Sequence, residues 1–260
     1  MAANFDLYLP GASWLHRLDP RVKLLLVVEG TVFLFLWPQV AAAAATLLAV
    51  HVLLRSARVP WSRIGALWRL VLPLTLLIPA LWLIFQPGPE PPLWAWGPLR
   101  LTMSALERGV AVALRLDALA FLMFLWLFTT SQAELVRGLA ALGMPYTWSL
   151  TLSLALRYLP TVAGLYQQVV DAQRARGLDL DHGPLRRRLQ AYQPILVAVL
   201  ISALRLSQGL AWSLEARGLG ASTARRSTYR PLHFTARDWA ATASLLILFL
   251  LAVAARTQLR

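Results

Sequence analysis

The chain has 260 residues, of which 58% are hydrophobic and 14% are charged, and its 25 basic against 12 acidic side chains leave a net charge of +13. A soluble domain has about 25% charged residues, so the composition excludes an ordinary soluble globule and predicts a membrane protein. The absence of cysteine excludes disulfides, thiolate metal sites and a cysteine nucleophile. The single lysine, Lys23, does not follow a glycine-rich turn, which excludes ATP binding through a phosphate-binding loop.

Four apolar regions approach the length needed to cross a bilayer, which is about 20 residues for ~30 Å of hydrocarbon. The first, Leu24–Leu54, is too long for one simple span and has Trp37-Pro38 almost at its middle. We therefore expect a short hairpin that crosses twice. Single spans are expected at Leu67–Phe85, Gly109–Thr129 and Trp239–Ala255.

Basic residues orient these spans, because they stay on the cytoplasmic side of a membrane. Arg17, Arg21 and Lys23 precede the hairpin, and Arg55, Arg58 and Arg63 follow it, so both flanks are predicted to be cytoplasmic. The segment 86–100, with five prolines, is predicted to be an exterior loop. The segment 131–235 carries twelve arginines against five acids and is predicted to be cytoplasmic.

Five crossings follow from this orientation, with the C-terminus outside. No small-residue cleavage site comes directly after the first apolar core, so a retained, cytoplasmic N-terminus is expected. The predicted protein is an all-α, multi-pass protein of the inner (cytoplasmic) membrane.

A short helix is predicted at the start of the cytoplasmic segment. Ser131 and Glu134 have the spacing of a capping box, in which each side chain satisfies a free backbone N–H. Leu135, Leu139 and Leu142 form an apolar stripe at helical spacing, and Gly143-Met144-Pro145 is predicted to end the helix.

Two long helices are predicted next, at about Tyr146–Arg176 and Leu189–Arg217. Each is apolar in its first half and polar in its second, and either apolar half could pass for a span. Two further crossings would move Arg186-Arg187-Arg188 outside, which the distribution of positive charge disfavours. We therefore expect two cytoplasmic helices packed on each other, with their apolar halves facing the spans or another apolar partner.

Both long helices end in the same three residues, Ala175-Arg176-Gly177 and Ala216-Arg217-Gly218, 41 positions apart. One interpretation is a helix end, because glycine supplies a left-handed cap and arginine suits the negative helix terminus. The other is functional: an arginine at a helix tip is a five-donor group suited to a carboxylate on a partner protein. The repetition of the motif does not by itself decide between these two interpretations.

The sequence resembles the transmembrane T component of energy-coupling factor (ECF) transporters, which are ABC-type importers. The resemblance covers nearly the whole chain. It rests on the N-terminal segment Leu15–Leu24, on Thr129-Thr130-Ser131, on Arg157-Tyr158-Leu159-Pro160 and, most specifically, on the two Ala-Arg-Gly motifs, all in the expected order.

The resemblance implies a coupling subunit that joins two cytoplasmic ATPase subunits to a small substrate-binding membrane protein, the S component, for uptake of a vitamin or a transition-metal ion such as cobalt or nickel. It implies that Arg176 and Arg217 dock into grooves on the ATPases, with Arg157 and Pro160 as further coupling candidates. It divides the chain into residues 1–130 (four spans), 131–235 (a coupling domain inserted before the last span) and 236–260 (the C-terminal span).

Other charged groups favour structural roles. Arg115 lies within a predicted span and should face protein or water, and Asp117, two residues on, points to a different face. Asp179, Asp181 and His182 lie in a polar loop without further ligands, so no metal or other cofactor is predicted. The basic clusters near the membrane favour anionic lipid over nucleic acid.

Two other functions compete with a non-enzymatic coupling subunit. One is an integral membrane enzyme acting at the cytoplasmic membrane surface, which would need clustered acids or histidines. The other is a self-contained secondary transporter, which would need related halves. The sequence shows neither a suitable cluster nor a repeat of the spans.

Overall fold

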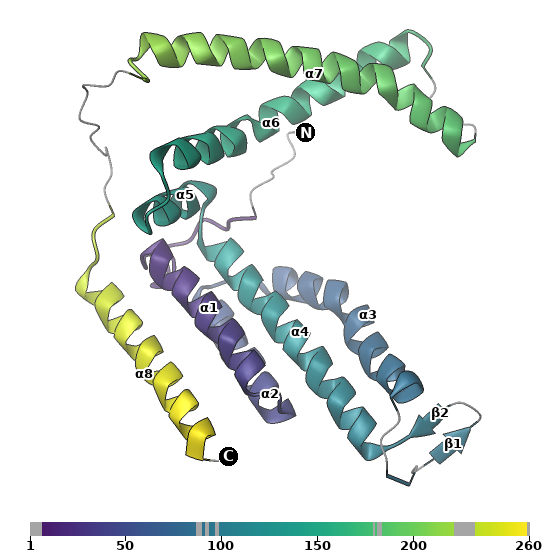
Figure 1. The fold of residues 1–260 in the computed structure, drawn as a ribbon, viewed down its shortest axis with the longest axis vertical. Coiled ribbons are helices and arrows are strands. Elements are labelled where there is room, and N and C mark those ends of the chain that lie inside the picture. Colours follow the sequence, from purple (N-terminus) through teal and green to yellow (C-terminus); the bar gives the residue numbers. More distant parts are fainter. Residues whose placement is uncertain are drawn as a thin grey trace. The chain divides into compact units, whose positions relative to one another are not determined.

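The computed structural model describes residues 7–86, 90–91, 94–96, 99–178, 180, 184–220 and 232–258. The chain forms two compact units: Asp6–Met144 with Leu232–Arg260, which we call the bundle unit, and a second built on Pro145–Pro231, which we call the helix-pair unit. Helices account for nearly all of the described structure (Figure 1).

The bundle unit contains six helices and one small hairpin among the described residues. The helices are α1 (Pro20–Leu36), α2 (Val40–Ser56), α3 (Trp61–Phe85), α4 (Met103–Thr129), α5 (Gln132–Ala141) and α8 (Ala236–Gln258). Between α3 and α4, strands β1 (Trp94–Trp96) and β2 (Leu99–Leu101) pair antiparallel, with Ala95 opposite Arg100. This hairpin lies in the segment predicted as an exterior loop.

The turn between α1 and α2 lies where the sequence predicted it. α1 ends at Leu36 and α2 begins at Val40, so Trp37-Pro38 occupies the connection. Proline lacks a backbone N–H and disfavours helix at the preceding residue, which ends α1 there. Each helix has 17 residues and is about 25 Å long, so both are short, as the sequence predicted.

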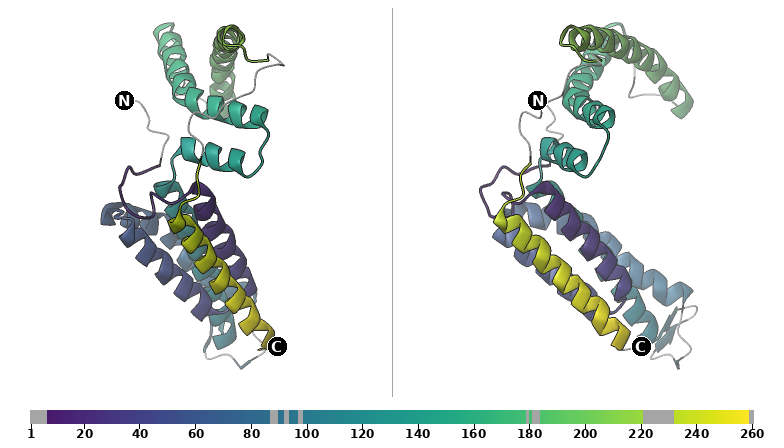
Figure 2. Two further views of the ribbon diagram at one scale, coloured as in Figure 1. Left: turned by 90° about the vertical axis from the view of Figure 1, so that its left-hand side faces the viewer. Right: turned by 60° about the vertical axis from the view of Figure 1, so that its left-hand side comes forward.

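α4 lies at the centre of the bundle, because α1, α2 and α3 all pack against it. Phe121 of α4 is fully buried in the same apolar core as Leu34 of α1 and Leu54 of α2. Gly109 permits a close approach to α3, since a Cβ atom there would lie 2.7 Å from the Cα atom of Pro79. The last helix, α8, packs against α1, beside which it lies in both views of Figure 2.

α5 begins with the predicted capping box, in which Ser131 and Glu134 each bond the other's backbone N–H. Its buried face differs from the predicted leucine stripe. Val136 and Gly138 are buried, while Leu142 is exposed. The reason is tertiary: Gly138 lies against Pro20 of α1, where a Cβ atom would be 3.1 Å from that ring. α5 thus belongs to the bundle unit, although the sequence division grouped 131–144 with the coupling domain.

The helix-pair unit consists of α6 (Tyr146–Ala175) and α7 (Leu185–Ala216). α6 matches its predicted range, whereas α7 begins four residues before the predicted Leu189. Pro184 is its N-cap residue, and proline is favourable at a helix start because its missing N–H would be unpaired there. The two helices meet through a small core of Val170, Leu180 and Ile195.

Within the described residues, four helices are long and apolar enough to cross a membrane: α3, α4, α8 and the part of α7 from Arg188 to Ala216. α2 is apolar but shorter. The predicted class, a helical multi-pass membrane protein, is confirmed, with an approximate number of spans.

Candidate coupling site

The two Ala-Arg-Gly motifs adopt the same backbone geometry. At the end of α6, Gly177 has φ +86°, its N–H donates to the carbonyl of Arg174 at 2.9 Å, and the N–H of Leu178 donates to the carbonyl of Gln173 at 3.0 Å. This pair of hydrogen bonds, closed by a left-handed residue, is a Schellman motif.

The end of α7 has the same Schellman motif. Gly218 has φ +78°, its N–H donates to the carbonyl of Glu215 at 2.8 Å, and the N–H of Leu219 donates to the carbonyl of Leu214 at 3.0 Å. The cap interpretation of the motif is therefore correct at both helix ends. It explains the glycine, because a side chain is strained at positive φ, but it does not require arginine before it.

The two arginines are the C-cap residues, and both side chains are exposed. Among the described residues, neither guanidinium has an ion pair or a side-chain hydrogen bond that would hold it to its own chain. Arg176 is near the start of α7 and Arg217 is at its far end. Because α7 has 32 residues, about 48 Å of helix, the two arginines lie far enough apart for separate partners.

Large apolar side chains remain exposed along both helices of the pair. On α7, Leu189, Leu200 and Leu204 are 65%, 62% and 63% exposed, although leucine is a typical core residue. The same helix also exposes Leu196, Val197, Ile201 and Trp212, and α6 exposes Tyr146, Trp148, Leu159 and Tyr166. Contiguous exposed apolar surface of this kind marks an interaction surface or contact with lipid.

The other candidate residues lie on α6 and in the bundle unit. Arg157 and Pro160 are exposed on α6, and Arg176 lies 16 residues beyond the proline, about 24 Å along the helix. Arg115 is in the bundle unit, half-buried, with its guanidinium carbon 5.9 Å from the ring centre of Phe35. Within the helix-pair unit, Arg157 and Pro160 thus lie well along α6 from the cap that carries Arg176.

Asp117 pairs with Thr75 and not with Arg115, in agreement with its predicted position on a different face. The hydroxyl of Thr75 on α3 lies 2.8 and 3.0 Å from its two carboxylate oxygens. The acidic loop candidates Asp179, Asp181 and His182 lie outside the described residues. In the part of the chain that is described, no group of three or more histidines and carboxylates is arranged to hold a metal ion.

A buried polar junction was not predicted from the sequence. The amino group of Lys23, which is 4% exposed, donates to the carbonyls of Thr129 at 2.7 Å and of His16 at 3.1 Å. His16 is held in turn by Ser13, 2.6 Å from its Nδ1, and by the carbonyl of Leu9, 3.0 Å from its Nε2. The one sequence feature that could have indicated this junction is the single lysine directly before an apolar run.

The same junction includes the start of α8. One carboxylate oxygen of Asp238 accepts from the backbone N–H of Asp19 at 2.8 Å, and the other accepts from the N–H and hydroxyl of Thr235 at 2.8 and 2.6 Å. Arg21 lies over the ring of Phe234. The segment around Asp19 and Lys23 therefore ties together the ends of α1, α4 and α8.

Comparison with known proteins agrees with the resemblance. A protein family described as cobalt transport protein matches residues 11–229, a range that includes both capped arginines. Three relatives are named energy-coupling factor transporter transmembrane protein EcfT. The protein of Bacillus subtilis is 30% identical with 93% of each chain covered, that of Heliobacterium modesticaldum is 32% identical with 94% of each covered, and that of Acidaminococcus fermentans is 33% identical with 81% of each covered. The chain belongs to the family of transmembrane components of energy-coupling factor transporters.

Proposed function

We propose that this chain is the coupling subunit of its transporter and that it transmits the ATP-driven movement of two cytoplasmic ATPases to a substrate-binding S component. The observation that carries the proposal is the pair of identical caps, each presenting an exposed arginine whose guanidinium is not engaged by any described part of the chain. The caps hold the backbone of each arginine in a fixed direction, which suits docking to a rigid surface.

Arg176 and Arg217 bind acidic groups on the ATPases in this proposal. A guanidinium presents a fork of donors that pairs with both oxygens of a carboxylate. Their separation along α7 gives each ATPase its own contact. Arg157 and Pro160 lie on the same helix as Arg176, so they are candidates for transmitting movement along α6 rather than for the contact itself.

The exposed apolar faces of α6 and α7 form the platform for the S component. Large side chains such as Leu200, Leu204 and Trp212 are exposed to an extent that suits an apolar partner. When ATP binding closes the ATPase pair, the two arginine-tipped helices slide relative to each other and the platform changes shape. This is a shear movement of packed helices.

The helix-pair unit is cytoplasmic in this proposal, although part of α7 is apolar enough to span. A crossing at α7 would separate Arg186–Arg188 from Arg217 by the membrane, against the distribution of positive charge. The bundle unit agrees with this orientation, because Arg21, Arg55 and Arg63 lie at the helix ends predicted to be inside. The N-terminus and residues 131–235 are thus cytoplasmic, with 1–130 and 236–260 supplying the spans.

The transported substrate is a vitamin or a transition-metal ion held by the S component. Co-purification in mild detergent, followed by mass spectrometry, tests the whole assignment. We expect two ATPases and one small hydrophobic protein to accompany the chain, and the identity of the small protein then narrows the substrate. Hydrolysis of ATP or transport of substrate by the purified chain alone would contradict the proposal.

A further inference from the structure

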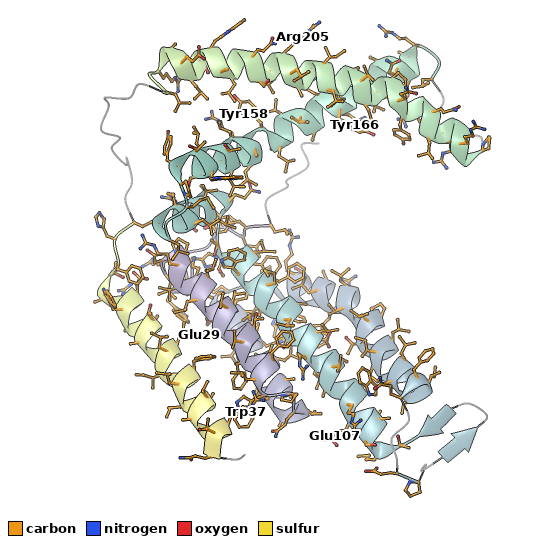
Figure 3. The ribbon with its side chains drawn as sticks, viewed as in Figure 1. Glu29, Trp37, Glu107, Tyr158, Tyr166 and Arg205 are labelled. Atoms are coloured by element: carbon orange, nitrogen blue, oxygen red, sulfur yellow. The ribbon has the colours of Figure 1, made fainter. Side chains whose placement is uncertain are left out.

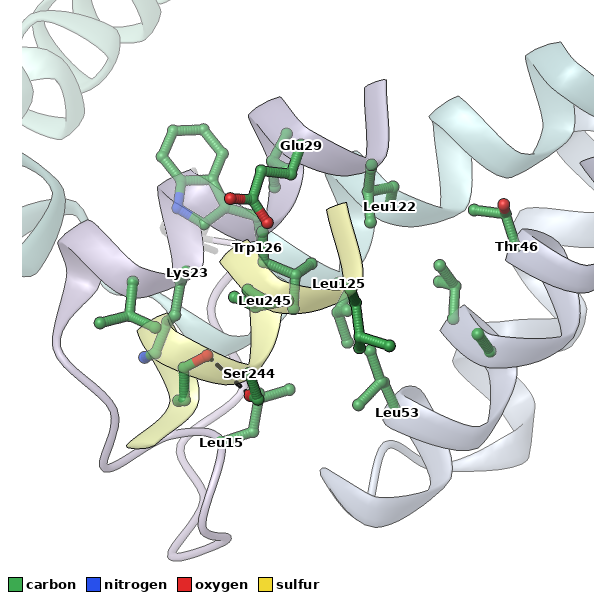
Figure 4. A pocket seen from close by; sticks show the side chains of 18 of the residues that line it. Leu15, Lys23, Glu29, Thr46, Leu53, Leu122, Leu125, Trp126, Ser244 and Leu245 are labelled. Carbon is green, nitrogen blue, oxygen red and sulfur yellow. Dashed lines mark hydrogen bonds between the residues drawn. The ribbon is translucent and has the colours of Figure 1, made fainter. Parts of the chain in front are cut away.

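The bundle unit has a long apolar groove between α2 and α8, with α1 and α4 as its floor. Its volume is about 1130 Å³, and its lining consists almost entirely of apolar side chains. Two charged residues of α1 depart from this pattern, and the amino group of one of them, Lys23, is already bonded to the carbonyls of Thr129 and His16. Glu29 of α1 lines the groove and is only 9% exposed (Figure 4).

The carboxylate of Glu29 is incompletely satisfied. Its Oε1 atom is fully buried and has no hydrogen-bond partner within the described part of the chain. A buried carboxyl group without a partner is unfavourable, because it loses its hydration and gains nothing in return. Inside a membrane such residues face protein interiors or functional contacts. A hydrogen-bond donor from outside the chain would complete this group.

The depth of Glu29 in the membrane restricts which molecule can supply the hydrogen-bond donor. Glu29 lies nine residues after Pro20, the first residue of α1, which is about 13 Å along the helix. Figure 3 shows it midway along α1, away from the end of the bundle that carries Trp37 and Glu107. This depth is near the middle of ~30 Å of hydrocarbon, far from the headgroup of a phospholipid.

The walls of the groove favour a helix over an acyl chain. Ala45 and Ala49 of α2 line one side, and Ala241, Ser244 and Ala252 of α8 line the other. Small residues at a membrane interface let helix backbones approach closely, and a polar side chain at such an interface bonds across it. We propose that the groove docks a transmembrane helix of another membrane subunit, which presents a hydrogen-bond donor to Glu29 at mid-depth.

This inference rests on the proposed function only in requiring a second membrane subunit. It adds a contact within the bilayer to the platform formed by α6 and α7. Photo-crosslinking in membranes that contain the whole complex tests it. The chain has no cysteine, so the single variants Ala49→Cys and Ser244→Cys can each carry a benzophenone maleimide at one defined position. Leu70→Cys, on an exposed apolar position of α3 outside the groove, is the matched control.

We expect both groove positions to form adducts with one transmembrane peptide of a different subunit, and the Leu70→Cys control to form adducts with lipid. Lipid adducts alone at the groove positions, or adducts with a second copy of this chain, would overturn the proposal.

Retention of the partner provides a second readout. Glu29→Leu should lower co-purification of the membrane subunit by about tenfold, as expected for the loss of one buried hydrogen bond, while the ATPases stay bound. Glu107→Leu, which changes an exposed carboxylate on α4, should have no effect. Full retention with Glu29→Leu would refute the groove contact and leave the proposed function intact. A wild-type complex without any second membrane subunit would instead refute the proposed function.

Discussion

The amino group of Lys23 donates a 2.7 Å hydrogen bond to the carbonyl oxygen of Thr129, so the start of α1 is tied to the last residue of α4. That carbonyl belongs to the final turn of a helix, where no further helical N–H is available to it. Lys23 thus caps α4 from a distance of 106 residues in the sequence. The first prediction concerns this contact.

Lys23→Met should destabilise the bundle unit. The variant leaves two buried carbonyls, those of Thr129 and His16, without their donor. A hydrogen bond to a charged group contributes roughly 1.5–3 kcal/mol, and relief from burying the ammonium group offsets part of the loss. We expect the free energy of unfolding to fall by about 2–3 kcal/mol, measured by thermal unfolding in detergent. Arg63→Met, which removes an exposed cation, should leave the transition unchanged.

Asp238→Ala should loosen the start of α8. The carboxylate accepts three hydrogen bonds, one from Asp19 and two from Thr235, and their loss should cost about 2–4 kcal/mol. Limited trypsin digestion measures the change, because Arg237 lies next to the affected turn. Cleavage there should accelerate in Asp238→Ala and less in Asp238→Asn, which keeps one acceptor oxygen. Equal cleavage rates for all three proteins would show that the junction does not hold α8.

Gly177→Ala and Gly218→Ala should weaken the two caps. Both glycines have positive φ, where a Cβ atom costs about 1–2 kcal/mol. The matched controls are Gly164→Ala and Gly209→Ala, which lie inside α6 and α7 with open space around them and should gain about 0.5–1 kcal/mol. Hydrogen exchange of the last helical turn should therefore quicken in the first pair and slow in the second. The same sign in both pairs would contradict the cap geometry.

Local signals in the sequence predicted much of the fold. The capping box at Ser131, the turn at Trp37-Pro38 and the glycine ends of α6 and α7 all act within a few residues, so the sequence shows them directly. Which face of α5 is buried within the bundle unit was not predictable, for the opposite reason. The contact of Gly138 with Pro20 decides that face, and this pairing depends on the packing of α1 rather than on helical spacing.

The polar junction and the groove were beyond sequence reasoning because they join distant residues. Asp19 and Asp238 are 219 residues apart. In the sequence, each one alone resembles an ordinary charged residue near a membrane boundary. The role proposed for Glu29 likewise depends on α2 and α8, which form the walls of the groove around it. The glycine caps beside Arg176 and Arg217 could be expected from the sequence, whereas the exposed apolar face of α7 beside them could not be distinguished from a membrane span.

The central claim is that these two capped arginines join the chain to its ATPases. The decisive measurement compares substrate uptake and ATPase co-purification for the double variant Arg176→Glu/Arg217→Glu with those for Arg205→Glu, which reverses an exposed charge in the middle of α7, away from both caps (Figure 3). We predict that the double variant loses both substrate uptake and co-purification of the ATPases while still folding in the membrane. Arg205→Glu should retain both. Unchanged ATPase assembly and uptake in the double variant would contradict the account.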